Sequence, residues 1–170
     1  GEKNAGVSLH IYDINASKTQ KIDLSNYNDF YIARLKWTYD ANVLSAQVLN
    51  RHQDNLDLLF VDGNSGAKKV VLNEKDKAYV DVTDNLTFLK DNSFIWTSEK
   101  DGYNHIYLYD KNGKLKNQVT KGNWEVTSYY GFDEKTKTVF YQSVEKGSIL
   151  RDVYKISLDG KKKVKLSSQV

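Results

Sequence analysis

The sequence predicts an all-β protein assembled from a repeated four-stranded antiparallel unit. Four runs of alternating apolar residues each end in an aspartate, at Asp13, Asp62, Asp110 and Asp159, and these positions are spaced by 48 or 49 residues. No segment sustains the apolar spacing and capping signals of a helix. A period near 48 residues with strands rich in β-branched and aromatic side chains is typical of a β-propeller blade.

The first element that repeats is a β-hairpin centred on the aligned aspartate. Each aspartate is followed by a turn rich in Gly, Asn, Ser and Lys, for example "GNSGAK" after Asp62. An Asp carboxylate can accept hydrogen bonds from the turn backbone, and Gly tolerates a positive φ, so both residue types suit a tight turn. The second strand of each hairpin finishes at Leu24, Leu72, Val119 and Leu166.

Two further strand-like runs lie between successive hairpins. The first of each pair covers residues 31–38, 78–89 and 124–132, and the second covers residues 43–50, 93–99 and 138–145. Short polar turns join the members of each pair. We therefore expect four strands in every complete repeat, and we expect Trp37, Trp96 and Trp124 to contribute to blade packing where they are buried.

The repeat predicts the organisation of the whole chain. Residues 1–170 are expected to form a fragment of one β-propeller domain, because propellers close with about four to eight blades. The expected parts are a partial blade at residues 7–24 and three complete blades at residues 31–74, 78–121 and 124–168.

Composition excludes several classes of function. The formal net charge is +3 and the lysines are spread along the chain, so we expect no nucleic-acid partner. The apolar runs are short, so we expect neither a membrane span nor a signal peptide. The absence of Cys excludes disulfides, thiolate zinc sites and cysteine nucleophiles.

No catalytic, cofactor-binding or metal-binding residue is predicted. The string "GNSGA" at residues 63–67 fails the last position of a serine-hydrolase elbow and falls in a repeat turn. The histidines are His10, His52 and His105, and none has the spacing of a metal ligand set. We expect His10 and His105, on the hairpin strands, to be packed or hydrogen-bonded core residues.

The loops between the second and third strands are the candidate interaction surface. They cover residues 50–55, 98–104 and 144–151 and are expected to emerge on one face of the ring, where repeat proteins place binding residues. A solvated rim without partners is the alternative. The expected interface residues are Arg51, His52, Gln53, Glu99, Lys100, Tyr103 and Arg151.

Two motifs carry a resemblance to a known family. They are "SEKDGYNHIY" at residues 98–107 and "KGNWEV" at residues 121–126. Together with the flanking repeats over residues 30–168, the chain resembles the N-terminal β-propeller domain of bacterial dipeptidyl peptidase IV, in the prolyl oligopeptidase family of serine peptidases.

This resemblance implies a parent enzyme in which an eight-bladed propeller precedes an α/β-hydrolase domain with a Ser, Asp and His triad. Such a parent would release Xaa-Pro and Xaa-Ala dipeptides from peptide N-termini, and the propeller would scaffold and gate the active site. The family's paired Glu motif has no match here, because the chain contains no Glu-Glu dipeptide.

The resemblance also implies partners and a compartment. The partners would be the hydrolase domain of the same parent chain and the parent's peptide substrates, and the parent would be periplasmic. Unpaired strand edges of a partial ring also predict self-association, which a constant monomer mass in light scattering would contradict. The alternative is a protein-interaction propeller of the Tol-associated type, without enzymatic activity.

Overall fold

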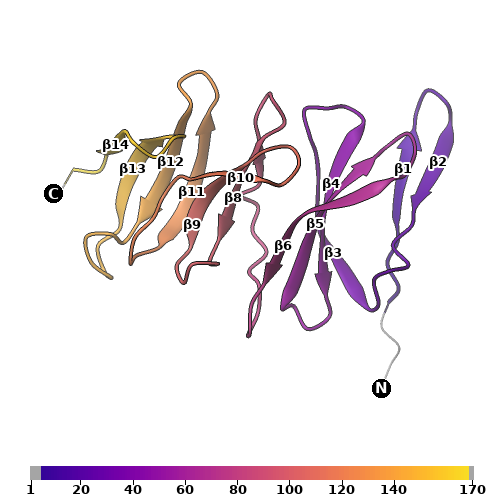
Figure 1. Ribbon diagram of the computed structural model, residues 1–170, viewed down its shortest axis with the longest axis horizontal. Helices are drawn as coiled ribbons and strands as arrows, with labels where there is room; N and C mark the ends of the chain where they lie inside the picture. Colours follow the sequence, from indigo (N-terminus) through magenta and orange to yellow (C-terminus); the bar gives the residue numbers. More distant parts are fainter. Residues whose placement is uncertain (1–4, 169–170) are drawn as a thin grey trace. The chain divides into compact units, whose positions relative to one another are not determined.

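The structure is a computed structural model that describes residues 5–168, and all of its regular elements are strands (Figure 1). The chain divides into two compact units, Gly1–Val82 and Thr83–Val170, and each is described by itself. The described residues contain no helix that is long and apolar enough to cross a membrane. The fold is that of a partial all-β propeller, as the sequence predicts.

The first unit contains a two-stranded and a four-stranded antiparallel sheet. The hairpin pairs β1 (Leu9–Asp13) with β2 (Lys18–Ile22). The larger sheet has the order β3-β4-β5-β6, so every strand pairs with its neighbours in the chain. Its strands are β3 (Phe30–Trp37), β4 (Val43–Asn50), β5 (Asn55–Asp62) and β6 (Lys68–Lys75).

The core of the first unit lies between the hairpin and the larger sheet. Leu9 and Ile11 of β1 and Ile22 of β2 are buried in the same cluster as Ala46 of β4 and Val61 of β5. Alternate residues of β1 face this cluster, because successive side chains of a strand point to opposite sides.

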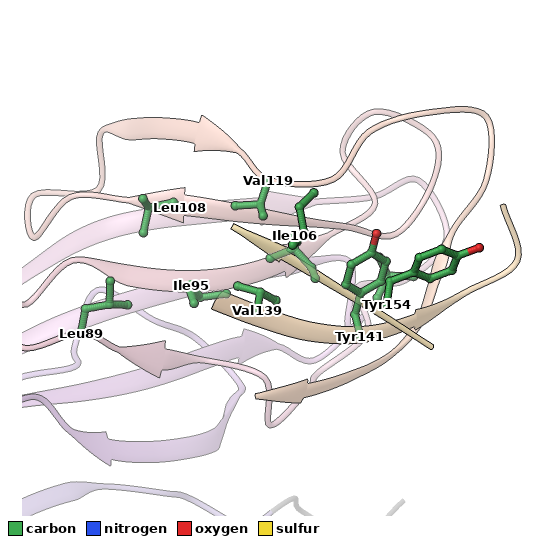
Figure 2. Packing of buried hydrophobic residues seen from close by; sticks show 10 residues of the cluster. Leu89, Ile95, Ile106, Leu108, Val119, Val139, Tyr141 and Tyr154 are labelled. Carbon is green, nitrogen blue, oxygen red and sulfur yellow. The ribbon is translucent and has the colours of Figure 1, made fainter. Parts of the chain in front are cut away.

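The second unit contains two four-stranded meanders. The first has β7 (Thr87–Phe88), β8 (Phe94–Ser98), β9 (His105–Tyr109) and β10 (Leu115–Gln118). The second has β11 (Val126–Asp133), β12 (Thr138–Ser143), β13 (Asp152–Ser157) and β14 (Lys163–Lys165). The two sheets bury a shared cluster that includes Ile95, Ile106, Val139 and Tyr141 (Figure 2).

The aligned aspartates have the turn chemistry that the sequence predicts. Asp13 Oδ1 accepts from the amide of Asn15 at 2.8 Å, and Asp62 Oδ1 accepts from that of Asn64 at 3.0 Å. The later repeats have the same bond two residues on: the amide of Asn112 donates to Asp110 at 2.8 Å, and that of Lys161 donates to Asp159 at 3.0 Å.

The turns between first and second strands use the same device, which the repeat alignment did not reveal. Oδ1 of Asp40, Asp91 and Asp133 accepts an amide hydrogen bond from the residue two positions later, at 3.0, 3.0 and 2.9 Å respectively. An Asp side chain that accepts a hydrogen bond from the backbone of its own turn fixes the position at which the strand ends.

The predicted strand over residues 78–89 is wrong for most of its length, because only Thr87 and Phe88 pair in β7. Side-chain hydrogen bonds replace the missing ladder. Asn85 donates its amide to Thr97 Oγ1 at 3.1 Å, and the Thr83 hydroxyl lies 3.3 Å from the same oxygen. Asn and Asp residues in this stretch favour such local bonds over strand pairing.

One expectation about burial is corrected and one is confirmed. His10 is exposed and lies 3.0 Å from Ser8 Oγ, because it points away from the cluster that buries Leu9 and Ile11. Trp37, on β3, is 51% exposed. His105 is fully buried and hydrogen-bonded on both ring nitrogens, as expected of a core histidine.

Candidate functional site

The β4–β5 loop is held by the side chain of Asn50. Its Oδ1 accepts from the amides of Asp54 and Asn55, both at 3.1 Å, and its Nδ2 donates to Asp54 Oδ1 at 2.7 Å. Gln53 has a φ of 60°, and its carbonyl accepts from the amide of Val80 at 2.7 Å. The backbone of Gln53 therefore organises the loop, whereas its side chain is exposed.

Arg51 and His52 form the outer part of this loop, and both are exposed. The Arg51 guanidinium lies 5.2 Å from the ring centroid of Tyr31 and donates to the Tyr31 hydroxyl. Stacking on an aromatic ring fixes the direction of a guanidinium. Arg51 is thus preoriented at the surface.

The β8–β9 loop folds back over two tyrosines through Lys100. The Lys100 ammonium lies 4.0 Å from the ring centroid of Tyr107 and 5.0 Å from that of Tyr109, and it donates to the Tyr109 hydroxyl at 2.6 Å. Cation–π contacts of this kind contribute about 0.5–1 kcal/mol each at exposed positions. Lys100 therefore anchors its loop in addition to facing solvent.

Two neighbours of Lys100 complete the anchoring. Asp101 accepts from Gln118 Nε2 at 2.6 Å. Burial acts to raise the pKa of Asp101, but hydrogen bonds from Gln118 and Tyr107 outweigh it and hold that pKa below its usual value. The side-chain amide of Asn104 donates to the Val126 carbonyl at 2.8 Å, and the backbone carbonyl of Asn104 accepts from the Val126 amide at 2.8 Å. Glu99 and Tyr103 remain exposed at the loop surface.

The β12–β13 loop carries an exposed apolar tip. Ile149 is 89% exposed, the neighbouring Leu150 is also exposed, and Arg151 follows them. Gly147 has a φ of 144° and starts a turn in which the Leu150 amide donates to its carbonyl at 2.9 Å. Sequence reasoning selected Arg151 and missed Ile149, although an apolar pair inside a predicted turn was the available signal.

Charged side chains at the two ends of this loop hold the outermost strand. Glu145, with a side chain only 9% exposed, pairs with Lys163 of β14, and Asp152 pairs with Lys165 at 2.9 Å. Burial, together with the charges of Glu145 and Asp152, raises the pKa of Tyr154 to about 12. The loop is therefore fixed at its base and exposed at its tip.

The structure brings the β8–β9 and β12–β13 loops to the same edge of the second unit. Asn104, at the end of the first loop, pairs with Val126, and Val126 lies opposite Ser143, where the second loop begins. This edge presents Glu99, Tyr103 and Arg151. Arg51, His52 and Gln53 belong to the first unit, where they lie together in one loop.

The arrangement supplies contact groups rather than reaction chemistry. Within residues 5–168 there is no cluster of three or more His, Asp or Glu side chains suited to a metal ion. The exposed groups include arginines, the Tyr103 ring, the Glu99 carboxylate and the apolar tip at Ile149. Of these, arginine and aromatic side chains are types enriched at protein interfaces.

Comparison with known proteins agrees with the resemblance seen in the sequence. The family model for the dipeptidyl peptidase IV (DPP IV) N-terminal region matches residues 1–170. A crystal structure of dipeptidyl peptidase 4 from Porphyromonas gingivalis is 42% identical, with a TM-score of 0.91, and the match covers 99% of this chain and 24% of that one. A putative dipeptidyl aminopeptidase IV from Bacteroides ovatus gives a TM-score of 0.77 at 27% identity, covering 92% and 25%.

Curated relatives point the same way. A probable dipeptidyl peptidase 4 from Aspergillus flavus is 30% identical over 169 residues, covering 92% of this chain and 22% of the relative. The chain therefore spans about a quarter or less of the proteins that it matches. These matches do not favour the Tol-associated alternative. This chain belongs to the dipeptidyl peptidase IV N-terminal region family, as a noncatalytic propeller segment.

Proposed function

We propose that this segment scaffolds and gates the active site of a dipeptidyl peptidase IV-like serine exopeptidase. The observation that carries the proposal is the structural match to the Porphyromonas gingivalis enzyme over 99% of the chain. The parent would remove Xaa-Pro and Xaa-Ala dipeptides from peptide N-termini, using a triad in a hydrolase domain of the same chain. The segment would limit access to that domain, because a ring of blades excludes folded proteins.

The parent's activity is tested on the intact protein. An antibody raised against this segment recovers the parent from its source cells, and the parent is then treated with a fluorophosphonate probe for serine hydrolases. We expect labelling that an Xaa-Pro dipeptide inhibitor blocks. A parent that is not labelled would favour the interaction propeller instead.

The gating role is tested by changing the loop edge in the parent. Replacing Ile149 by Ser and Arg151 by Ala is expected to change kcat/KM for a long peptide by roughly 5- to 10-fold, which corresponds to about 1 kcal/mol. Ile14→Ser is the matched control, because Ile14 is 81% exposed in a hairpin turn outside these loops. Equal effects of the two changes would contradict a role for the loop edge.

We also propose that the parent is periplasmic, on the basis of the resemblance to bacterial members of the family. Osmotic-shock fractionation of the source cells, followed by detection with the same antibody, tests this. Recovery with the spheroplasts would contradict it.

A further inference from the structure

Three of the aligned hairpin turns carry an asparagine two residues after the aspartate. These asparagines are Asn15, Asn64 and Asn112, and all three are exposed. Asparagine is a thermolabile residue, because the backbone amide nitrogen of the next residue can attack its side-chain amide. The attack is fastest before glycine, which has no side chain to crowd the attacking nitrogen. Asn112 is followed by Gly113, and this is the only Asn-Gly pair in the sequence.

The hydrogen bond on the attacking nitrogen also differs between the turns. The Ser65 amide, which follows Asn64, donates to Asp62 Oδ1 at 2.7 Å, and the corresponding amide of the first hairpin has the same kind of bond at 3.0 Å. The Gly113 amide donates instead to the backbone carbonyl of Asp110 at 3.0 Å. Hydrogen bonds to an ionised acceptor are about twice as strong as neutral ones. The proton that must leave is therefore held less firmly at Gly113.

The Asp110 carboxylate binds the amides on both sides of Gly113. Its Oδ1 accepts from the amide of Asn112 at 2.8 Å and from that of Lys114 at 2.9 Å. Gly113 has a φ of 83°, a conformation that glycine adopts without steric cost. The geometry that closes this turn thus leaves the attacking nitrogen to the neutral carbonyl.

We propose that Asn112 is a modification site, where the side-chain amide converts to aspartate and isoaspartate without an enzyme. The Gly113 amide nitrogen loses its proton and bonds to Cγ of Asn112. The Cγ–Nδ2 bond breaks, so ammonia leaves with that proton and a cyclic imide remains. Water then opens the imide, at Cγ to give isoaspartate's isomer aspartate, or at the backbone carbonyl to give isoaspartate, whose main chain runs through Cβ. The inference does not depend on the proposed peptidase function.

The isoaspartate form changes the turn, because its main chain is one atom longer. The turn closes through the Asp110 amide, which donates to the Lys114 carbonyl at 2.9 Å. An extra main-chain atom between these residues shifts the register at the start of β10. This strand also holds the next sheet, because Asn117 Nδ2 donates to the Leu158 carbonyl at 3.0 Å. The modification therefore loosens β10 and its bond to the neighbouring sheet.

Peptide mapping of the intact parent protein by mass spectrometry tests the site. The parent is incubated at mildly alkaline pH, and conversion of Asn15, Asn64 and Asn112 is followed in the same molecules. We expect Asn112 to convert at least roughly tenfold faster than the other two, which corresponds to a barrier lower by about 1.4 kcal/mol. Methyl transfer by a protein isoaspartate methyltransferase identifies the isoaspartate form, and Asn112→Gln should abolish it. Conversion of Asn112 no faster than that of Asn64 would overturn the proposal.

The variant Ser65→Gly separates the effect of the structure from that of the neighbouring residue. It places glycine after Asn64 and keeps the backbone amide that Asp62 holds. In the urea-unfolded variant, Asn64 and Asn112 should convert at similar rates. In the folded variant Asn64 should be slower by at least roughly fivefold, because only its attacking amide is bonded to a carboxylate. Equal rates in the folded variant would contradict the role of the hydrogen bond.

Hydrogen exchange tests the effect on β10. The isoaspartate form is separated from the unmodified parent by ion-exchange chromatography, and Asn112→Asp is the matched control, because it has the same added charge and an unaltered main chain. The amides of Leu115–Gln118 should exchange at least roughly fivefold faster in the isoaspartate form than in Asn112→Asp. Equal protection of these amides in the two proteins would show that the modification does not loosen β10.

Discussion

Replacing His105 by Leu should destabilise the second unit, because both ring nitrogens of His105 make hydrogen bonds that no apolar side chain can make. Its Nε2 lies 3.0 Å from the Gly122 carbonyl, which can only accept, so Nε2 carries the proton. Nδ1 then accepts from Thr120 Oγ1 at 3.1 Å, and that oxygen accepts the Ile106 amide at 2.9 Å. Trp124 meets the ring edge-on, with centroids 4.9 Å apart.

The magnitude follows from these contacts. A buried carbonyl left without its donor costs about 1–3 kcal/mol. The edge-on aromatic contact contributes about 0.5–1.5 kcal/mol. We therefore expect His105→Leu to lower the free energy of unfolding by about 2–4 kcal/mol, with a fall in Tm of roughly 4–16 °C for a chain of this size.

The assay is urea unfolding followed by tryptophan fluorescence in a Trp37→Phe background, which leaves Trp96 and Trp124 of the second unit as reporters. His10→Leu is the matched control, because His10 is exposed on the corresponding strand of the first hairpin. It should change the free energy of unfolding by less than about 0.5 kcal/mol. A loss below about 1 kcal/mol for His105→Leu would refute the reasoning.

Three further predictions concern burial and charge. Trp96 is 4% exposed and Trp37 is 51% exposed. Trp96→Ala should therefore lower the free energy of unfolding by about 3–5 kcal/mol, whereas Trp37→Ala should lower it by less than about 1 kcal/mol. Urea unfolding measures both losses, and equal losses would contradict the difference in burial. The Tyr141 hydroxyl is buried and has no hydrogen-bond partner among the described residues. Tyr141→Phe should therefore leave the free energy of unfolding unchanged or raise it by up to about 1 kcal/mol. A clear fall in the free energy of unfolding, measured in urea, would contradict this. Backbone hydrogen bonds from Ser65 and Lys114 hold the pKa values of Asp62 and Asp110 below 3.8. These bonds stabilise the folded chain above that value and are lost as pH falls through the lower folded pKa, so Tm should fall as the pH drops below about 3.8. Replacing both aspartates by Asn should flatten that dependence in thermal scans.

The repeated hairpins could be predicted because their determinants are local. Asp13, Asp62, Asp110 and Asp159 each bond an amide two residues away, so a single sequence position fixes the turn. The environment of a residue within a repeat could not be predicted in the same way. His10 and His105 share strand parity, but β9 is buried on both faces and β1 on one.

The candidate loops show the same limit. The sequence identifies Lys100 as a loop cation, but its place over Tyr107 depends on the side-chain direction of β9, which lies beyond the turn. The stretch before β7 has the apolar residues of a strand, yet Asn85 and Thr97 bond each other through side chains and compete with the ladder. Such competition is decided by three-dimensional neighbours and not by pattern.

The pairing of every strand with its neighbour in the chain has a consequence for synthesis. Each sheet needs only contiguous residues, such as Phe30–Lys75 for β3 to β6. At about 5–20 residues per second a ribosome takes roughly 2–9 s to make such a stretch, whereas a hairpin forms in about 1–10 μs. Each meander can therefore form its ladder before the next one has been translated, and the order of folding follows the direction of translation.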